Sequence, residues 1–130
     1  MKPFALLDAH ALIWYLRGDP RLSHTALQLI DDASIRLLLS AASIYEIINK
    51  VQIGKLGLSQ PPQRLLPQTL RKIGAKVLPL RGSHVLRVAR LPLHHKDPFD
   101  RMLLAQASVE GLPIITADTM FTKYPVKLIW

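Results

Sequence analysis

Short apolar runs alternate along the chain with longer amphipathic segments. The continuous apolar run at 4–7 is typical of a strand buried on both faces of a sheet. Four later runs predict further strands, at 35–39, 76–80, 112–115 and 126–129. Segments with apolar residues at helical spacing predict helices between them, at 9–16, 23–33, 43–53, 61–73, 82–91 and 97–110.

This alternation of strands and helices predicts an α/β fold. The strands are expected to form a mostly parallel central sheet of about five strands, with helices on both faces. Such an arrangement is a three-layer sandwich. The 130 residues, of which 49% are hydrophobic, suffice for one sizeable core, so we expect a single domain over residues 1–130.

The composition excludes several classes of site and membrane segment. The chain has no cysteine, which rules out disulfides, thiolate catalysis and cysteine-ligated metals. The first apolar stretch is interrupted by Asp8 and His10, unlike a signal peptide, and no apolar run approaches the roughly 20 residues that span a bilayer. We therefore expect a soluble, cytoplasmic protein without a membrane partner.

The charge is strongly basic, but the acidic residues are not evenly spread. Seventeen Lys and Arg against nine Asp and Glu give a formal net charge of +8, which favours a polyanionic partner such as nucleic acid. Five of the nine acids stand where an apolar segment ends or a helix begins: Asp8, Glu46, Asp97, Asp100 and Asp118. A basic protein with concentrated carboxylates suggests a metal site facing a phosphate backbone.

Four of these acids are expected to meet at one edge of the sheet. In an open parallel sheet, ligands bind beyond the carboxyl ends of the strands. Asp8 directly follows the first predicted strand, and Asp118 follows the strand at 112–115. Glu46 and Asp100 are predicted in the first turns of the helices at 43–53 and 97–110, and such helix starts gather at the same edge.

Carboxylates gathered in this way point to a divalent cation. Like charges a few ångströms apart raise one another's pKa and oppose folding, and a cation removes that penalty. Ligation by oxygen alone suits a hard ion, Mg²⁺ or Mn²⁺. Such an ion lowers the pKa of a bound water and stabilises charge on a phosphoryl oxygen, so phosphodiester hydrolysis is the predicted reaction.

The helix-start acids also have structural interpretations, which remain open. Ser43 and Glu46 match a capping box, and Asp118 is placed to cap a short helix towards Lys123. We assign Asp97 the structural role of N-cap before Pro98. Asp8 is the acid least easily explained as a cap, because a carboxylate at the end of a buried strand carries a desolvation cost.

Nearby basic side chains admit two interpretations each. His10 either contacts the site or packs locally, while Lys50 and Arg101 either grip phosphate or orient a ligand, or form solvated ion pairs, as Glu46 and Lys50 are four residues apart on a helix. His94 and His95 are interpreted as part of a solvated polar loop, with an approach to phosphate as the alternative.

The motifs around these acids resemble those of a known family over essentially the whole chain. They are LLDAHALIWYL, SAASIYEIINKVQIGKL, HHKDPFDRMLLAQA, and LPIITAD followed by TMF. In this order they resemble PIN-domain ribonucleases, specifically the VapC-type toxins of bacterial toxin–antitoxin pairs. Family members often have Thr directly after the first Asp, where this chain has Ala9.

The resemblance implies a PIN-like fold, a metal site and a biological role. It places Asp8, Glu46, Asp100 and Asp118 in a Mg²⁺ or Mn²⁺ site. It further implies RNA as substrate, a homodimer, and a cognate antitoxin that covers or disables the site. Two alternatives stay open: an RNA-binding or partner-binding module without catalysis, and a metal phosphatase acting on small substrates.

Overall fold

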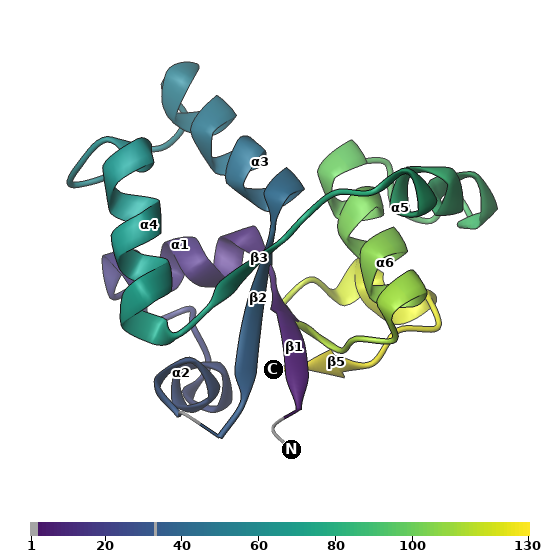
Figure 1. The fold of residues 1–130 in the computed structure, drawn as a ribbon, viewed down its shortest axis with the longest axis horizontal. Coiled ribbons are helices and arrows are strands. Elements are labelled where there is room, and N and C mark those ends of the chain that lie inside the picture. The colour runs from purple at the N-terminus through teal and green to yellow at the C-terminus, as the bar shows by residue number, and fades with distance from the viewer. Residues whose placement is uncertain (1–2, 33) are drawn as a thin grey trace.

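The computed structural model describes residues 3–32 and 34–130, which form one five-stranded sheet flanked by helices (Figure 1). In chain order, the elements are β1 (Phe4–Leu7), α1 (Ala9–Arg17), α2 (His24–Asp31), β2 (Arg36–Ser40), α3 (Ala41–Gln52), α4 (Pro62–Ile73), β3 (Lys76–Leu78), α5 (Gly82–Arg87), η1 (Val88–Arg90), α6 (Pro98–Glu110), β4 (Ile114–Ile115), η2 (Thr119–Lys123) and β5 (Leu128–Ile129), where η denotes a 3₁₀ helix.

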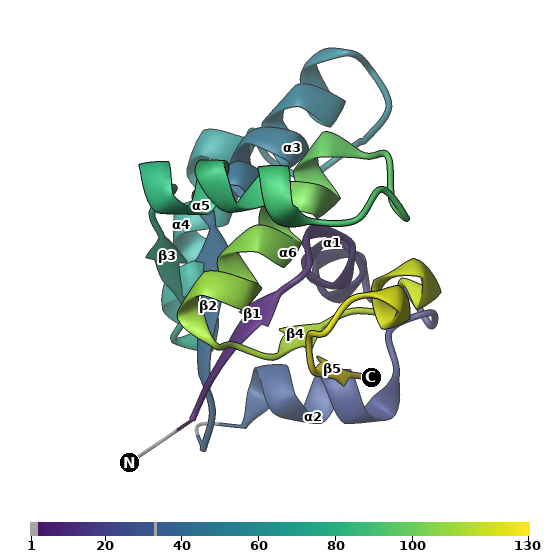
Figure 2. The same cartoon turned by 90° about the vertical axis from the view of Figure 1, so that its right-hand side faces the viewer.

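The sheet has the strand order β3-β2-β1-β4-β5, and every neighbouring pair is parallel. The first strand lies in the middle, where Leu6 pairs with Leu38 on one side and Ile114 on the other. Helices α1, α2 and α4 cover one face, and α5 and α6 cover the other (Figure 1). In a view turned by 90°, α5 lies beside α6, and α6 crosses in front of β1 (Figure 2). The predicted α/β sandwich with a parallel sheet is confirmed.

The central strand is buried on both faces, as its unbroken apolar run predicts. Ala5 and Leu7 pack in one core with Leu12 of α1. Leu6 points to the other face and packs with Leu104 of α6. Successive side chains of a strand alternate between the two faces, so each layer of helices has its own core.

Strands β3, β4 and β5 and helix α5 are shorter than their patterns predict. β3 ends at Leu78 because Pro79 has no N–H to donate to a ladder. β4 and β5 contain only two residues each. The predicted helix at 82–91 ends at Arg87 and continues as the 3₁₀ turn Val88–Arg90.

Two further boundaries concern the helices. The predicted end of the second helix, Ala33, lies outside the described residues, and α2 ends at Asp31. α3 begins at Ala41, earlier than predicted, because the Ser40 hydroxyl accepts the N–H of Ala42 as an N-cap. Within the described part of the chain, none of the helices is long and apolar enough to cross a bilayer.

Candidate metal centre

The four predicted ligands lie on elements that meet at the carboxyl edge of the sheet. Asp8 directly follows β1, and Asp118 follows β4 after a short extended segment. Asp100 lies in the first turn of α6. Glu46 lies on α3, in the second turn, because the helix already begins at Ala41; its predicted place in the first turn is wrong.

Asp8 is buried and bound by two donors. Its Oδ2 accepts the hydroxyl of Thr116 at 2.7 Å, and its Oδ1 accepts the backbone N–H of His10 at 3.4 Å. Asp8 is therefore the N-cap of α1, although from the sequence it was the acid least easily explained as a cap. The buried strand runs directly into the helix, so one residue both ends the strand and caps the helix. Burial raises the pKa of Asp8, and the two hydrogen bonds only partly offset this effect.

Thr116 connects two of the predicted ligands and was missed by the sequence reasoning. Its hydroxyl donates to Asp8 and accepts the backbone N–H of Asp118 at 3.1 Å. Family members often place a Thr directly after the first Asp, whereas the hydroxyl that contacts Asp8 here comes from the end of β4. The only sequence signal was a Thr at a strand end two residues before Asp118.

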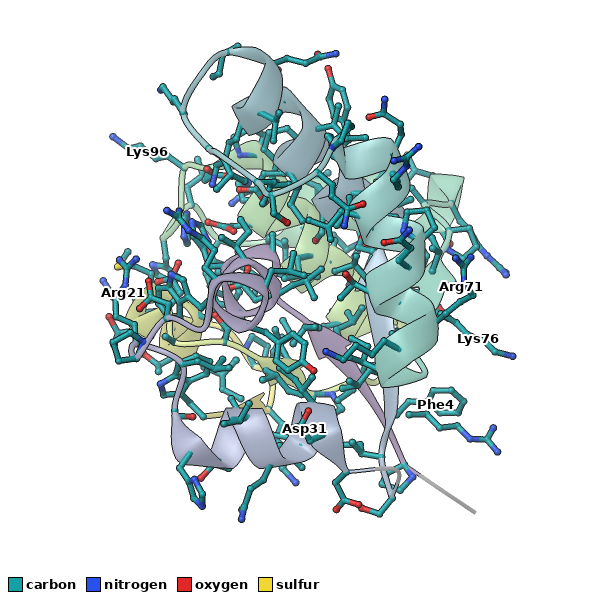
Figure 3. All side chains as sticks on the ribbon, turned by 90° about the vertical axis from the view of Figure 1, so that its left-hand side faces the viewer. Phe4, Arg21, Asp31, Arg71, Lys76 and Lys96 are labelled. Carbon is teal, nitrogen blue, oxygen red and sulfur yellow. The ribbon has the colours of Figure 1, made fainter. Side chains whose placement is uncertain are left out.

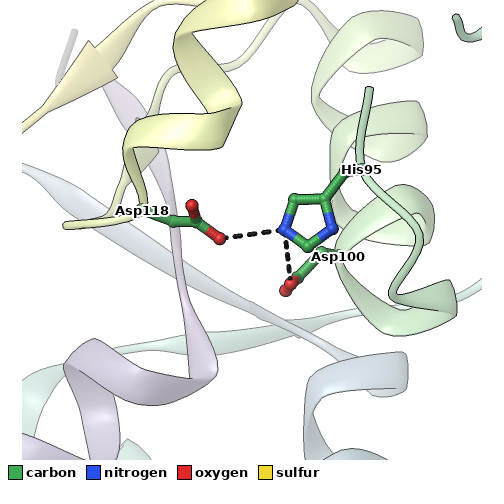
Figure 4. Close-up of side chains that lie close together, drawn as sticks. All are labelled: His95, Asp100 and Asp118. Atoms are coloured by element: carbon green, nitrogen blue, oxygen red, sulfur yellow. Dashed lines mark hydrogen bonds and ion pairs between the residues drawn. The ribbon is translucent and has the colours of Figure 1, made fainter. Parts of the chain in front are cut away.

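The tightest group of potential ligands consists of His95, Asp100 and Asp118 (Figure 4). Their ligand atoms lie within 4.8 Å of one another. His95 Nε2 is 3.0 Å from Asp100 Oδ2 and 2.9 Å from Asp118 Oδ2. Asp8 and Glu46 are not in this group.

The interpretation of His95 as part of a solvated loop is wrong. Its side chain is only 14% exposed, and its ring meets the ring of Phe121 edge-on, with centroids 5.6 Å apart. The periodicity of helices and strands does not indicate how a loop folds. The only sequence signal for the placement of His95 was its position two residues before the N-cap Asp97.

The capping interpretations are confirmed for two acids and wrong for a third. Asp97 caps α6 by accepting the N–H groups of Phe99 and Asp100 at 2.8 and 3.1 Å. Asp118 caps η2 through the N–H of Met120 at 2.9 Å. Ser43 and Glu46 form no capping box, because Ser40 takes the N-cap position of α3.

Glu46 contacts the rest of the site through basic side chains. Its Oε2 is 3.1 Å from Lys50 Nζ, which confirms the predicted ion pair between residues four apart. Lys50 Nζ lies 3.2 Å from His10 Nε2, and His10 Nδ1 lies 3.9 Å from Asp8 Oδ1. His10 thus borders the site, with 46% of its side chain exposed.

Arg101 does not form the predicted solvated ion pair with any of the described residues. Its guanidinium donates to the carbonyl oxygens of Val88, Leu91, Pro92 and His95, at distances from 3.0 to 3.4 Å. A planar group with five donors is suited to collecting several carbonyl groups at once. Arg101 therefore fixes the loop that carries His95. Its roles in gripping phosphate or orienting a ligand stay predictions.

The crowding of carboxylates has its largest effect on Asp100. Burial, followed by the charges of Asp97 and Asp8, raises the pKa of Asp100 to about 7, with a smaller contribution from Glu46. His95 opposes this shift. Asp8 and Glu46, the two predicted ligands outside the tight group, are therefore close enough to raise the pKa of Asp100 by electrostatic repulsion. The negative charges of these carboxylates repel one another, and a divalent cation bound by their oxygens would relieve that repulsion.

The raised pKa of Asp100 predicts that the metal-free protein loses stability as the pH rises. Between the ordinary pKa of 3.8 and the folded value of about 7, the folded state holds a proton that the unfolded state has released. Folding is then opposed increasingly from about pH 4 up to about pH 7. We expect the melting temperature in chelator to fall between pH 5 and 7, and the fall to be smaller in Asp100→Asn. An equal fall in both proteins would contradict this assignment.

The comparisons with known proteins agree with the fold. The chain is similar to VapBC2 from Rickettsia felis bound to a promoter DNA fragment, with a TM-score of 0.74 and 14% identity over 98% of both chains. It is also similar to DNA-bound VapBC from Salmonella typhimurium, with a TM-score of 0.67 and 20% identity over 99% of this chain and 98% of that chain. A toxin–antitoxin complex from Klebsiella pneumoniae has a TM-score of 0.67 and 19% identity over 97% of this chain and 96% of that chain.

The TM-scores establish a shared fold, whereas family membership rests on sequence. No curated protein matches the chain in a sequence search. The PIN domain family model, however, matches residues 5–127, which include every predicted ligand and the sheet except Phe4 and β5. This chain therefore belongs to the PIN-domain family.

Proposed function

We propose that the protein is a metal-dependent endoribonuclease that hydrolyses RNA phosphodiester bonds, and that it is the cytoplasmic toxin of a toxin–antitoxin pair. Asp8, Glu46, Asp100 and Asp118 are the proposed ligands of a Mg²⁺ or Mn²⁺ ion. The observation that carries the proposal is the meeting of carboxylates from distant elements at the carboxyl edge of the sheet, where ligand atoms of His95, Asp100 and Asp118 lie within 4.8 Å of one another.

The bound cation would supply a water of lowered pKa and stabilise negative charge on the phosphoryl oxygens. The residues of the chain then have distinct tasks. Asp8 is held in one orientation by Thr116 and His10, so it presents a fixed carboxylate. Glu46 is held by Lys50, which also places a positive charge beside His10 at the border of the site.

The charge of the surface supports RNA as the substrate. The net charge is +8 although the acids of the centre are included in it. Side chains such as Arg71, Lys76 and Lys96 project outward from different parts of the molecule (Figure 3). The positive electrostatic field of such a surface attracts a long polyanion more strongly than a small phosphate ester.

An antitoxin and a second copy of the chain are the proposed partners. The similar structures from Rickettsia felis and Salmonella typhimurium are VapBC complexes, and the one from Klebsiella pneumoniae is a toxin–antitoxin complex. Leu86 on α5 and Leu93 expose 77% and 81% of their surface, which supports burial of this region in a homodimer.

The decisive experiment is cleavage of RNA with and without a divalent cation. We expect products with Mg²⁺ or Mn²⁺, none with chelator, and recovery when the ion is restored. Chelator-insensitive binding without products would instead indicate a non-catalytic RNA-binding module. Hydrolysis of a small phosphate ester in preference to RNA would indicate a phosphatase.

The same ion should stabilise the folded protein. A ligand bound only by the folded state adds about 2.7 kcal/mol at a concentration 100 times its Kd. We expect Mg²⁺ or Mn²⁺ to raise the melting temperature, while a monovalent salt at equal ionic strength leaves it nearly unchanged. A melting temperature indifferent to both divalent ions would speak against a metal centre.

A further inference from the structure

His95 occupies the centre of the tight group without being one of the proposed ligands. Its Nε2 lies almost equally far from one oxygen of Asp100 and one oxygen of Asp118, at 3.0 and 2.9 Å (Figure 4). These two acids come from α6 and from the segment after β4, which are far apart in sequence. His95 is thus the side chain that links them directly.

The hydrogen-bond network assigns the proton of the neutral ring to Nε2. The backbone N–H of Asp97 points to Nδ1 at 3.3 Å, so Nδ1 is an acceptor. Nε2 then carries the hydrogen and donates it to Asp118 Oδ2, while Asp100 Oδ2 lies 3.0 Å from the same nitrogen. A histidine that ligates a metal through Nε2 needs the opposite tautomer, in which Nδ1–H usually donates to a carbonyl or carboxylate. The geometry therefore favours a donor over a ligand.

The loop that carries His95 is anchored on two sides. Arg101 donates to the carbonyl oxygens of Pro92 and His95, at 3.0 and 3.4 Å. The hydroxyl of Tyr124 accepts the backbone N–H of His95 at 2.8 Å and donates to the carbonyl of Pro92 at 2.8 Å. The ring also meets Phe121 edge-on. These contacts leave the imidazole little freedom to turn away from the carboxylates.

From these contacts we propose that His95 is a positioning residue of the metal centre, which holds the side chains of Asp100 and Asp118 in the orientation that receives the cation, through its Nε2 hydrogen bond to Asp118 and its 3.0 Å contact with Asp100. The inference rests on the proposed function and adds a residue to the proposed site. Each carboxylate oxygen has a second lone pair, and Asp100 Oδ1 has no hydrogen-bond partner in the described part of the chain. Both acids can therefore bind an ion while they stay in contact with His95.

The proposal predicts how metal affinity responds to the length and chemistry of the side chain at position 95. Loss of a hydrogen-bond partner of a metal ligand typically costs about 10- to 100-fold in affinity. We expect His95→Ala to raise the Kd for Mn²⁺ by this factor. His95→Gln should regain most of the affinity, because its amide nitrogen reaches about as far as Nε2 and donates a hydrogen. His95→Asn is too short and should behave like Ala.

The test is titration calorimetry of the full chain with Mn²⁺, together with the electron paramagnetic resonance spectrum of the bound ion. His24→Ala, a change at an exposed histidine on α2, is the matched control and should leave the Kd unchanged. Circular dichroism of the metal-free variants shows whether each has folded, and the Gln variant tests the proposal even if the Ala variant does not fold.

Three results would overturn the role of His95 while wild-type binding remains intact. An unchanged Kd in the Ala variant would remove it from the centre. A lower Kd would mean that the imidazole competes with the ion. Nitrogen coupling to bound Mn²⁺ that disappears in the Gln variant would make His95 a ligand. If the wild-type chain binds neither Mn²⁺ nor Mg²⁺, the proposed metal centre itself fails, and the role of His95 fails with it.

Discussion

Replacing Asp8 by Asn is expected to abolish RNA cleavage and leave the fold intact. The amide oxygen of Asn can still accept the hydroxyl of Thr116, so the buried contact survives. The negative charge that would bind the cation is lost. If that binding contributes about 3 kcal/mol or more to the transition state, cleavage falls at least about a hundredfold, since each 1.36 kcal/mol corresponds to a factor of ten.

The measurement is the rate of RNA cleavage at saturating Mg²⁺ or Mn²⁺, combined with melting curves in chelator. Asp31→Asn is the matched control, because Asp31 is an exposed acid on α2 whose contact with the Tyr15 hydroxyl an Asn can retain. The control should cleave as the wild type does. Undiminished cleavage by the Asp8 variant would remove Asp8 from the mechanism.

The melting curves of the Asp8 variant carry separate information. Burial raises the pKa of Asp8, and its charge raises that of Asp100. Removing this charge relieves repulsion among the acids, so the metal-free variant should be at least as stable as the wild type. The gain in melting temperature on adding metal should shrink at the same time. A variant that is unfolded in chelator would show that Asp8 is needed mainly as the cap of α1.

The largest loss of stability is expected from Leu104→Ala. Leu104 lies on α6, is completely buried, and packs against Leu6 of the central strand and against Phe121. Removing a buried leucine side chain costs about 2–5 kcal/mol, because apolar contacts are lost and a cavity remains. This would take a large part of the total stability of a small domain.

Leu86→Ala is the matched control for this change. The same atoms are removed on α5, but 77% of Leu86 is exposed, so the monomer should change by no more than about 0.5 kcal/mol. Denaturant unfolding of both variants at low protein concentration measures the difference. Equal losses in the two variants would contradict the assignment of Leu104 to the core.

Much of the fold could be predicted because it depends on local periodicity. The apolar run of β1 predicted a strand buried on both faces, and the alternation of strands and helices predicted the parallel sheet. Element ends were less accurate, since single residues decide them. The N-cap Ser40 makes α3 begin earlier than predicted, and Pro79 makes β3 end earlier than predicted.

The sequence by itself determined which acids stand at the carboxyl edge of the sheet, because strand direction and helix starts follow from hydrophobic spacing. Only the tertiary structure decided which side chains contact them. Thr116, directly after β4, contacts Asp8 although the two residues are more than a hundred positions apart, and His95 is held by Arg101 and Tyr124. Such contacts depend on loop conformation and on the packing of distant elements, which no periodicity along the chain encodes.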